Sequence, residues 1–273
     1  AVPFLHAEQL MRALPTRAAP VLIGARQAWR VAAVLLVTAG FIVWLGRCTD
    51  IDLMLADALY DPGIHAFPWR HAWLTDTFNH VILKGLLSAA AAGVILAALL
   101  DAWRARRMRD THEPHNLLAR LRLRVVALSA LLVPLVISAL KQTSIAHCPW
   151  DLARYGGTEP YLRLFDALPF GVPPGHCLPA GHASSALWLV SLCVYWLPLR
   201  TRMAGRVAAA ALAFGGAVGW MQQLRGAHFL THTLWSTWIA CAIVLALVLV
   251  LQWQPLRRLR PLLEESDTVD EAA

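Results

Sequence analysis

The sequence predicts an all-α polytopic membrane protein whose helices form a bundle of six transmembrane spans. Its composition points to this class, because 58% of the 273 residues are hydrophobic and only 15% are charged, as in integral membrane proteins. The charged residues also lie in short blocks between uncharged runs. Six such runs occur, at residues 31–46, 85–100, 125–140, 183–199, 207–224 and 233–253.

The length of the runs leaves one alternative, since several are shorter than the roughly 18 to 20 residues that cross a bilayer and would also suit buried helices of a soluble protein. Flanking Arg and Lys residues can lengthen each span, because their long stems reach the interface. With the N-terminus inside, the inner segments hold 17 of the 24 Lys and Arg residues, which predicts that both termini are cytoplasmic. The net charge of +7 then faces anionic lipid and requires no nucleic-acid partner.

This topology divides the chain into three parts: a cytoplasmic N-terminal segment (1–30), a membrane domain (31–256) and a cytoplasmic tail (257–273). Two loops and one turn lie on the outer face. The first loop (47–80) contains FPWRHAWLTDTFNH, whose aromatic residues predict a segment that lies on the membrane surface and carries no chemistry. The second loop (141–179) and the turn (225–235) hold the unusual polar residues.

Three segments on this face resemble the ordered motifs of the type 2 phosphatidic acid phosphatase (PAP2) superfamily: KQTSIAHCP (141–149), PAGH (179–182) and GAHFLTH (226–232). The family pattern is Lys, six residues, Arg-Pro; then Pro-Ser-Gly-His; then Ser-Arg, five residues, His, three residues, Asp. Three motifs in the right order on one face are far more specific than any single motif. The resemblance implies a six-helix membrane fold with the motifs at the ends of the third, fourth and fifth helices.

The first two motifs match the family at five of their seven positions, which include both prolines, and depart from it at two. Lys141 matches the family lysine, whereas Cys148 stands where the family has arginine. Ala180 replaces the serine of the second motif, but Gly181 and His182 remain.

In the third motif, His228 matches the family nucleophile and His232 occupies the aspartate position. Gln222 stands where the family arginine is expected, and Arg225 is the natural substitute because it lies three residues before His228, on the same helical face. The departures resemble a bacterial subgroup of the family that carries CPWDL and RGAHF, present here at 148–152 and 225–229.

The same residues suit phosphoryl transfer on chemical grounds, since that reaction needs a nucleophile, cations for the phosphate oxygens and an acid for the leaving group. Lys141 and Arg225 supply the cations, and arginine can bind two oxygens at once. The backbone N–H groups at Ala180 and Gly181, where the fourth helix is expected to start, offer a further phosphate-binding site.

Histidine can act as nucleophile or acid near neutral pH. We therefore expect His228 to attack phosphorus and His182 to protonate the leaving group. His232, one turn after His228, could orient it through a hydrogen bond. His147 and His176 are expected to be polar loop residues that support the site.

Two cysteines of the outer loop, Cys148 and Cys177, are expected to form a disulfide if the outer compartment is oxidising. The alternative of another class is a metal-binding protein, because five histidines and two cysteines lie near one face, and His228 and His232 have the spacing of a helical ligand pair. The cations Lys141 and Arg225 suit an anion better than a metal, so we expect neither metal nor cofactor.

Together these features predict an enzyme of the bacterial inner membrane with its active site on the periplasmic side. It would hydrolyse a lipid phosphomonoester or diphosphate through a phosphohistidine intermediate, with membrane lipids as its surroundings. Transfer of the phosphate to a second lipid is the alternative reaction at the same site. Neither the identity of the lipid nor the oligomeric state follows from the residues.

Overall fold

The computed structural model describes residues 21–107 and 114–270, and these are almost entirely helical. Their α-helices are α2 (Ala25–Cys48), α3 (Ile51–Leu59), α4 (Lys84–Arg107), α5 (Pro114–Gln142), α6 (Gly181–Leu187), α7 (Thr201–Leu224) and α8 (Leu230–Asp270). A π-helix, η1 (Leu74–Leu83), leads into α4, and there are three 3-10 helices, η2 (Pro149–Asp151), η3 (Ala153–Tyr155) and η4 (Trp188–Trp196). In this part of the chain, β pairing is limited to isolated bridges, so the predicted all-α class is confirmed.

Five helical segments are long and apolar enough to cross a membrane: 25–48, 74–107, 117–142, 201–224 and 230–253. Each contains one of the predicted runs, and they indicate a membrane protein. The remaining run, 183–199, falls instead on the short helix α6 and the 3-10 helix η4. Because a 3-10 helix rises about 2.0 Å per residue, these two elements together extend roughly 28 Å, close to the roughly 30 Å hydrocarbon core. The count of six spans stays a prediction.

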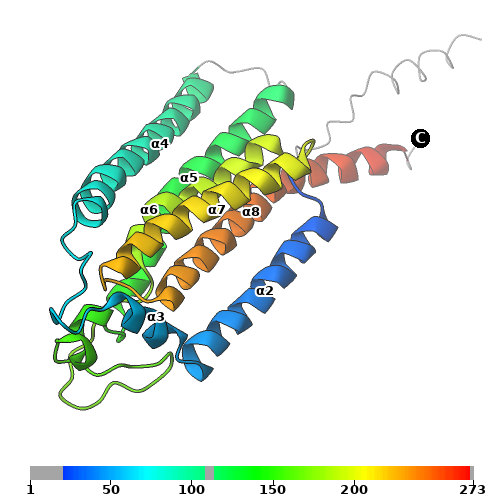
Figure 1. Cartoon of the computed structure of the whole chain (residues 1–273). Helices are drawn as coiled ribbons and strands as arrows, with labels where there is room; N and C mark the ends of the chain where they lie inside the picture. The colour runs from blue at the N-terminus through cyan, green and yellow to red at the C-terminus, as the bar shows by residue number, and fades with distance from the viewer. Residues whose placement is uncertain (1–20, 108–113, 271–273) are drawn as a thin grey trace, which may run out of the picture.

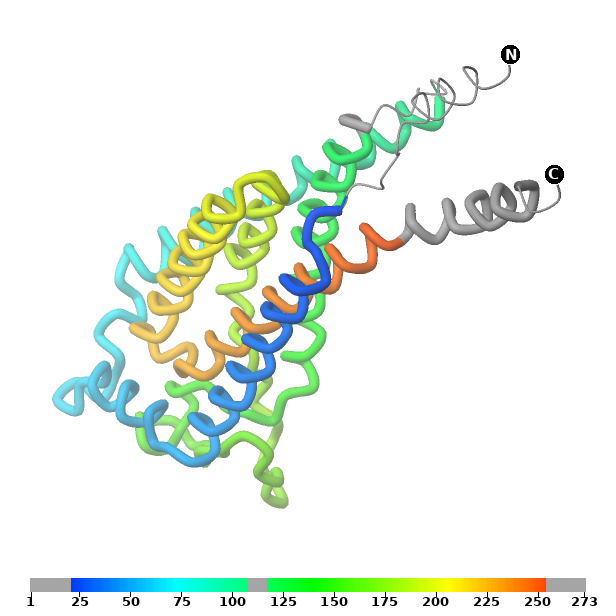
Figure 2. Tube along the Cα trace, turned by 90° about the vertical axis from the view of Figure 1, so that its right-hand side faces the viewer, coloured from blue at the N-terminus to red at the C-terminus, as the bar shows by residue number. Residues whose placement is uncertain are grey.

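The centre of the bundle is formed by α5, α6 with η4, α7 and α8 (Figure 1). Helix α4 packs against α5, and α2 lies along α8 (Figure 2). Glycines allow α7 to approach its neighbours closely, as is common between membrane helices: a Cβ atom at Gly215 would lie 2.4 Å from Leu187 Cδ2, and one at Gly219 would lie 2.4 Å from Thr233 Cγ2.

The predicted domain boundaries at residues 30 and 257 do not coincide with helix ends. Helix α2 begins at Ala25, and α8 continues to Asp270. Before α2, the backbone N–H groups of Leu22 and Ile23 donate to Gln252 Oε1 over 3.2 and 3.3 Å, so these residues belong to the bundle. Residues 1–20 of the predicted N-terminal segment lie outside the described residues.

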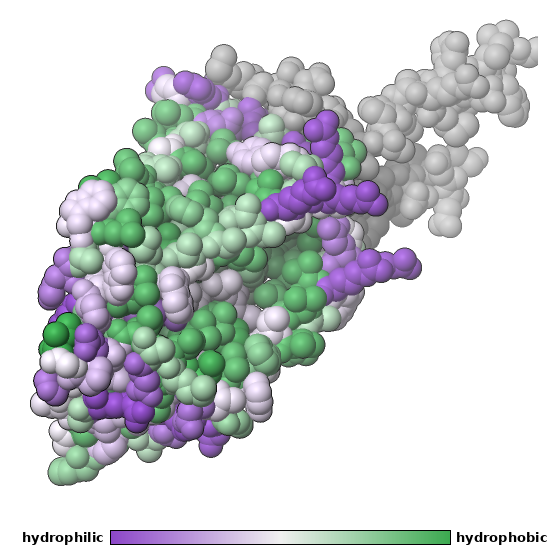
Figure 3. All heavy atoms as spheres, in the orientation of Figure 1, coloured by the Kyte–Doolittle hydropathy of each residue, from purple (hydrophilic) through white to green (hydrophobic). Residues whose placement is uncertain are grey.

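Figure 3 shows a hydrophobic surface along the middle of the bundle and hydrophilic residues gathered at its two ends. Apolar side chains such as Leu36 and Leu99 are 76% and 62% exposed, as expected for helices that face lipid. At one end, which we call the loop end, the segments 49–83, 143–180 and 225–229 come together (Figure 1). The loop end therefore contains all three of the motifs quoted above.

Candidate active site

His228 lies in the short turn between α7 and α8 and is buried, with 4% exposure. Its Nδ1 atom is 3.4 Å from Cys177 Sγ, so Nε2 is the ring nitrogen on the opposite side. Burial lowers the pKa of His228 well below its ordinary value, and the charges of neighbouring histidines and Lys141 act in the same direction, while a backbone hydrogen bond with Cys177 opposes them. A neutral imidazole carries the lone pair that a nucleophile needs.

The turn that holds His228 has a conformation that requires glycine at its start. Gly226 has φ of +71°, and a Cβ atom there would lie 2.3 Å from the ring of Phe67. The Gly226 carbonyl accepts the N–H of Trp150 over 3.0 Å. The turn is thus held by both outer loops.

The second outer loop contains the predicted disulfide: Cys148 and Cys177, which are 29 positions apart in sequence, are bonded, and their Cα atoms are 5.3 Å apart. The two limbs of this loop also pair through their backbones. The N–H groups of His176 and Cys177 donate to the carbonyls of Ser144 and Ala146 over 3.0 and 2.9 Å. This pairing places the disulfide beside His228.

The histidines of this loop do not contact the other candidate site residues within the described part of the chain. His147 Nε2 lies 2.9 Å from the carbonyl oxygen of Pro173 and 3.7 Å from Glu159 Oε2. His176 is a loop residue with φ of 49°. The Nδ1 atoms of both histidines are buried without a hydrogen-bond partner among the described residues, and their support of the site stays a prediction.

Arg225 is held by contacts that the sequence did not indicate. Its Nη2 donates to Asp76 Oδ1 over 2.7 Å, its Nη1 to His80 Nδ1 over 2.8 Å and to Gln222 Oε1 over 3.1 Å, and its Nε to the Arg70 carbonyl over 3.0 Å. Four of its five N–H groups are thus engaged, and one on Nη2 remains. The predicted two-point grip on phosphate would require Arg225 to release one of these partners.

The charge of Arg225 is compensated by the same segment. Burial lowers the pKa of Arg225, and Asp76 opposes this shift. Because the ordinary pKa of arginine lies far above neutrality, the guanidinium stays charged. Asp76 and His80 belong to η1, so the C-terminal half of FPWRHAWLTDTFNH packs against Arg225 and continues into a helix that is able to span a membrane from Leu74. A segment on the membrane surface was expected there instead.

His182 is the second residue of α6 and lies against His80. The centroids of the two rings are 3.9 Å apart, with an angle of 38° between their planes. His182 Nε2 is buried and has no hydrogen-bond partner among the described residues. A buried nitrogen without a partner is costly unless it serves a ligand. Burial and the neighbouring charges lower the pKa of His182 to about 3, so the ring would need the negative charge of a bound phosphate to hold the proton that a general acid gives.

Lys141 lies in the last turn of α5, and its side chain passes close to the start of α6, since a Cβ atom at Gly181 would lie 3.7 Å from Lys141 Cδ. Lys84 is a further cation that acts on both Lys141 and His182. The backbone of Ala180 does not serve as predicted. Its N–H donates to the carbonyl of His232 over 3.1 Å, so it is not available to phosphate, whereas Gly181 is the first residue of its helix, where backbone N–H groups lack intrahelical partners.

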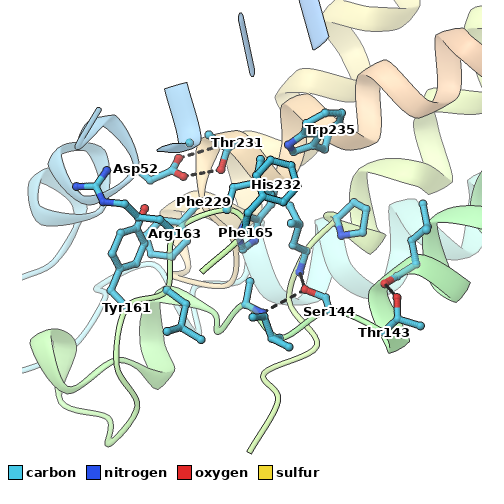
Figure 4. Close-up of a pocket in the computed structure, with 18 of the residues that line it drawn as sticks. Asp52, Thr143, Ser144, Tyr161, Arg163, Phe165, Phe229, Thr231, His232 and Trp235 are labelled. Carbon is cyan, nitrogen blue, oxygen red and sulfur yellow. Dashed lines mark hydrogen bonds between the residues drawn. The ribbon is translucent and has the colours of Figure 1, made fainter. Parts of the chain in front are cut away.

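His232 does not make the hydrogen bond to His228 that the sequence suggested. The two ring centroids are 5.8 Å apart with an interplanar angle of 66°, and His232 Nδ1 is buried without a partner among the described residues. His232 instead lines a cavity of about 450 Å³ between the loops and α8 (Figure 4). The cavity is mostly apolar, with Phe165 and Trp235 in its wall and Asp52 and Arg163 at one side.

Among the described residues, one group of side chains has the spacing of a possible metal site. Ligand atoms of Cys148, Cys177 and His228 lie within 4.8 Å of one another. However, the two sulfur atoms are bonded to each other, so neither can act as a thiolate ligand.

Comparison with protein families decides the assignment: the family model described as PAP2 superfamily matches residues 122–256. The chain belongs to the PAP2 superfamily. All three motifs lie inside the matched region, as do α6, η4 and α7 and the larger part of α5 and α8. Membership in the PAP2 superfamily indicates phosphatase or phosphotransferase activity on phosphate esters. No curated protein and no solved structure shows a significant match to the chain.

Proposed function

We propose that this chain is an integral-membrane lipid phosphatase that hydrolyses a phosphomonoester or diphosphate of a lipid. The observation that carries the proposal is the convergence of Lys141, His182 and His228 at the loop end. Lys141 Cδ would lie 3.7 Å from a Cβ atom at Gly181, next to His182. His228 lies in the turn between α7 and α8, near enough for Lys141 and His182 to add to the effect of burial in lowering its pKa. Arg225 lies three residues from His228, and Asp76 is the carboxylate that binds it. A site with several cations and few anions suits a phosphate group.

In the proposed first step, the neutral His228 attacks phosphorus in line with the leaving group. A P–N bond forms, the P–O bond to the leaving group breaks, and His182 gives a proton to the departing oxygen. Water then attacks the phosphohistidine and gives its proton to His182, which releases phosphate and restores both rings. Lys141 and Arg225 neutralise the charge on the phosphate oxygens in both steps.

A lipid substrate is supported by the cavity beside His232. Its volume of about 450 Å³ is in the range of small-molecule sites. Its wall includes Leu140, Trp235 and Ile239, which lie on the segments able to span a membrane. An apolar chain could therefore lie within the bundle while its phosphate remains at the loop end.

The disulfide supports an active site on the periplasmic side of a bacterial inner membrane, because disulfides persist in oxidising compartments. The basic residues at the other end of the bundle, which include the blocks 104–107 and 200–206, support a cytoplasmic location for that end and for both termini.

The proposal is tested by phosphate release from a panel of lipid phosphates and diphosphates in detergent micelles. We expect release from at least one lipid, and we expect His228→Ala to lower kcat roughly a thousandfold and His182→Ala about a hundredfold. His71→Ala, which changes an exposed histidine of the first loop, serves as the control. A wild-type protein that is folded but inactive on every lipid would refute a phosphatase. Transfer of the phosphate to a second lipid, in place of its release, would instead assign phosphotransfer.

A further inference from the structure

His80 is a half-buried residue of η1 that contacts two of the candidate catalytic groups at once. Its Nδ1 atom lies 2.8 Å from Arg225 Nη1, and its ring lies against that of His182, with centroids 3.9 Å apart. Among the described residues, it is the side chain that links the phosphate-binding arginine to the expected proton donor.

The contact with Arg225 determines the protonation of His80. Arginine has only N–H donors, so His80 Nδ1 must be the acceptor. The ring proton is therefore on Nε2, and the imidazole is neutral, because a doubly protonated ring has no acceptor. Because His80 is neutral, its ring can contact that of His182, with 38° between the ring planes, without placing two positive charges together even when His182 is protonated.

The π-helix itself is anchored so that His80 keeps this position. Asn79 Nδ2 donates to the carbonyl of Val218 on α7 over 3.4 Å, and Asp76 binds the other end of the Arg225 guanidinium. Long π-helical segments are rare and occur often at functional sites. Asp76 and His80 are four residues apart, so they lie on one face of the helix and both contact the same arginine.

We propose that His80 is a positioning residue of the phosphate site, which holds the Arg225 guanidinium through Nδ1 and the His182 ring through stacking. The inference rests on the proposed function for its kinetic consequences. The two contacts use different parts of the side chain, so two substitutions can separate them.

His80→Asn keeps an oxygen acceptor near the position of Nδ1 but removes most of the ring. We expect it to retain affinity for phosphate and to lower kcat about tenfold, because His182 loses its support. His80→Phe keeps a ring against His182 but removes the acceptor. We expect it to raise KM and to weaken phosphate binding about tenfold, as for the loss of one hydrogen bond to a charged group.

The experiment measures kcat and KM on the hydrolysed lipid and, separately, the binding of inorganic phosphate by calorimetry, using the full chain in detergent. His71→Asn is the matched control, since His71 is exposed in the same loop. Variants that stay within twofold of the wild type in all three quantities, or that lose kcat and affinity equally, would overturn the proposal. A wild type that binds phosphate but hydrolyses no lipid would refute the proposed function alone, because the binding arm still tests His80.

A measurement on the wild-type protein tests the proposal even if the His80 variants do not fold. Nitrogen NMR of labelled histidine should show His80 as the neutral Nε2–H tautomer at neutral pH. A proton on Nδ1 would exclude the contact with Arg225 as described and would overturn the proposal, whatever the activity.

Discussion

The carboxylate of Asp52 on α3 binds the first turn of α8 through Thr231. Oδ1 accepts the Thr231 backbone N–H over 3.0 Å, and Oδ2 accepts its hydroxyl. Asp52 is 4% exposed. A carboxylate suits a helix N-terminus, where backbone N–H groups lack partners within the helix. Since Thr231 lies between His228 and His232, Asp52 fixes the segment that carries both histidines.

Removal of this carboxylate should destabilise the fold. In Asp52→Ala, the buried N–H and hydroxyl of Thr231 lose their acceptors, and we expect the free energy of unfolding to fall by about 2 to 4 kcal/mol. Asp52→Asn is the matched control, because its amide can accept the N–H and donate to the hydroxyl. Thermal unfolding in detergent measures both variants, and equal Tm values for Asp52→Ala and the wild type would contradict this function of Asp52.

Asp52 should also give the stability a specific dependence on pH. Burial raises its pKa above the ordinary value of 3.8, while the hydrogen bonds from Thr231 oppose the shift. The folded state therefore binds this proton more tightly than the unfolded state, and the contribution to stability is present below pH 3.8 and lost as the pH rises through the folded pKa. Relative to the wild type, Asp52→Asn should become more stable as the pH rises above about 4. A difference that does not change between about pH 4 and about pH 7 would show that the pKa is not raised.

The sequence predicted the helices well because each apolar run is long and free of charge. The same criterion began the second span at residue 85 and so excluded Asp76 and His80, because only the fold reveals their contacts with Arg225 and His182. The 3-10 form of WLVSLCVYW was also not predicted, since its β-branched and aromatic residues only weakly disfavour an α-helix. The sequence around Asp52 does not predict its contact with Thr231, because the two residues lie far apart in the chain. The hydrogen bond from the Ala180 N–H to the His232 carbonyl is also a tertiary contact that the sequence does not predict.

Arg225→Lys should lose most of the activity. A lysine ammonium cannot keep the contacts to Asp76, His80, Gln222 and the Arg70 carbonyl and also present a donor to phosphate, so we expect kcat/KM to fall by at least about tenfold. Arg154→Lys is the control, because Arg154 makes a two-point contact with Asp57 at the surface, where ion pairs contribute little. Full activity in Arg225→Lys would show that the site needs only the positive charge of Arg225 and not its hydrogen bonds.

The orientation of the bundle can be tested with single cysteines in a Cys48→Ser background, since Cys48 is exposed. Phe170→Cys lies in the second outer loop and Arg202→Cys lies at the opposite end, and both positions are exposed. With a periplasmic loop end, a membrane-impermeant maleimide added to intact cells should label Phe170→Cys, whereas Arg202→Cys should react only after permeabilisation. The reverse pattern would place the site in the cytoplasm.

The disulfide should act mainly on the geometry of the site. It closes a loop between residues 29 positions apart, which predicts a stabilisation of roughly 3 to 4 kcal/mol from the entropy of the unfolded chain. Its Cys177 sulfur also lies against His228 Nδ1, so Cys148→Ser should release this sulfur from the position in which it contacts the nucleophile. We therefore expect kcat to fall while the protein still inserts into the membrane.

Peptide mass spectrometry without reductant should detect the bond between Cys148 and Cys177. In a second experiment, kcat and Tm are measured for Cys148→Ser and for the control Cys193→Ser. The control removes a free cysteine of η4, remote from the loops, and should leave kcat unchanged. If protein purified without reductant has two alkylated thiols, the bond is absent. If Cys148→Ser lowers Tm but keeps full kcat, the disulfide stabilises the loop without positioning His228, because a nucleophile that depends on the Cys177 sulfur would lose rate as well as stability.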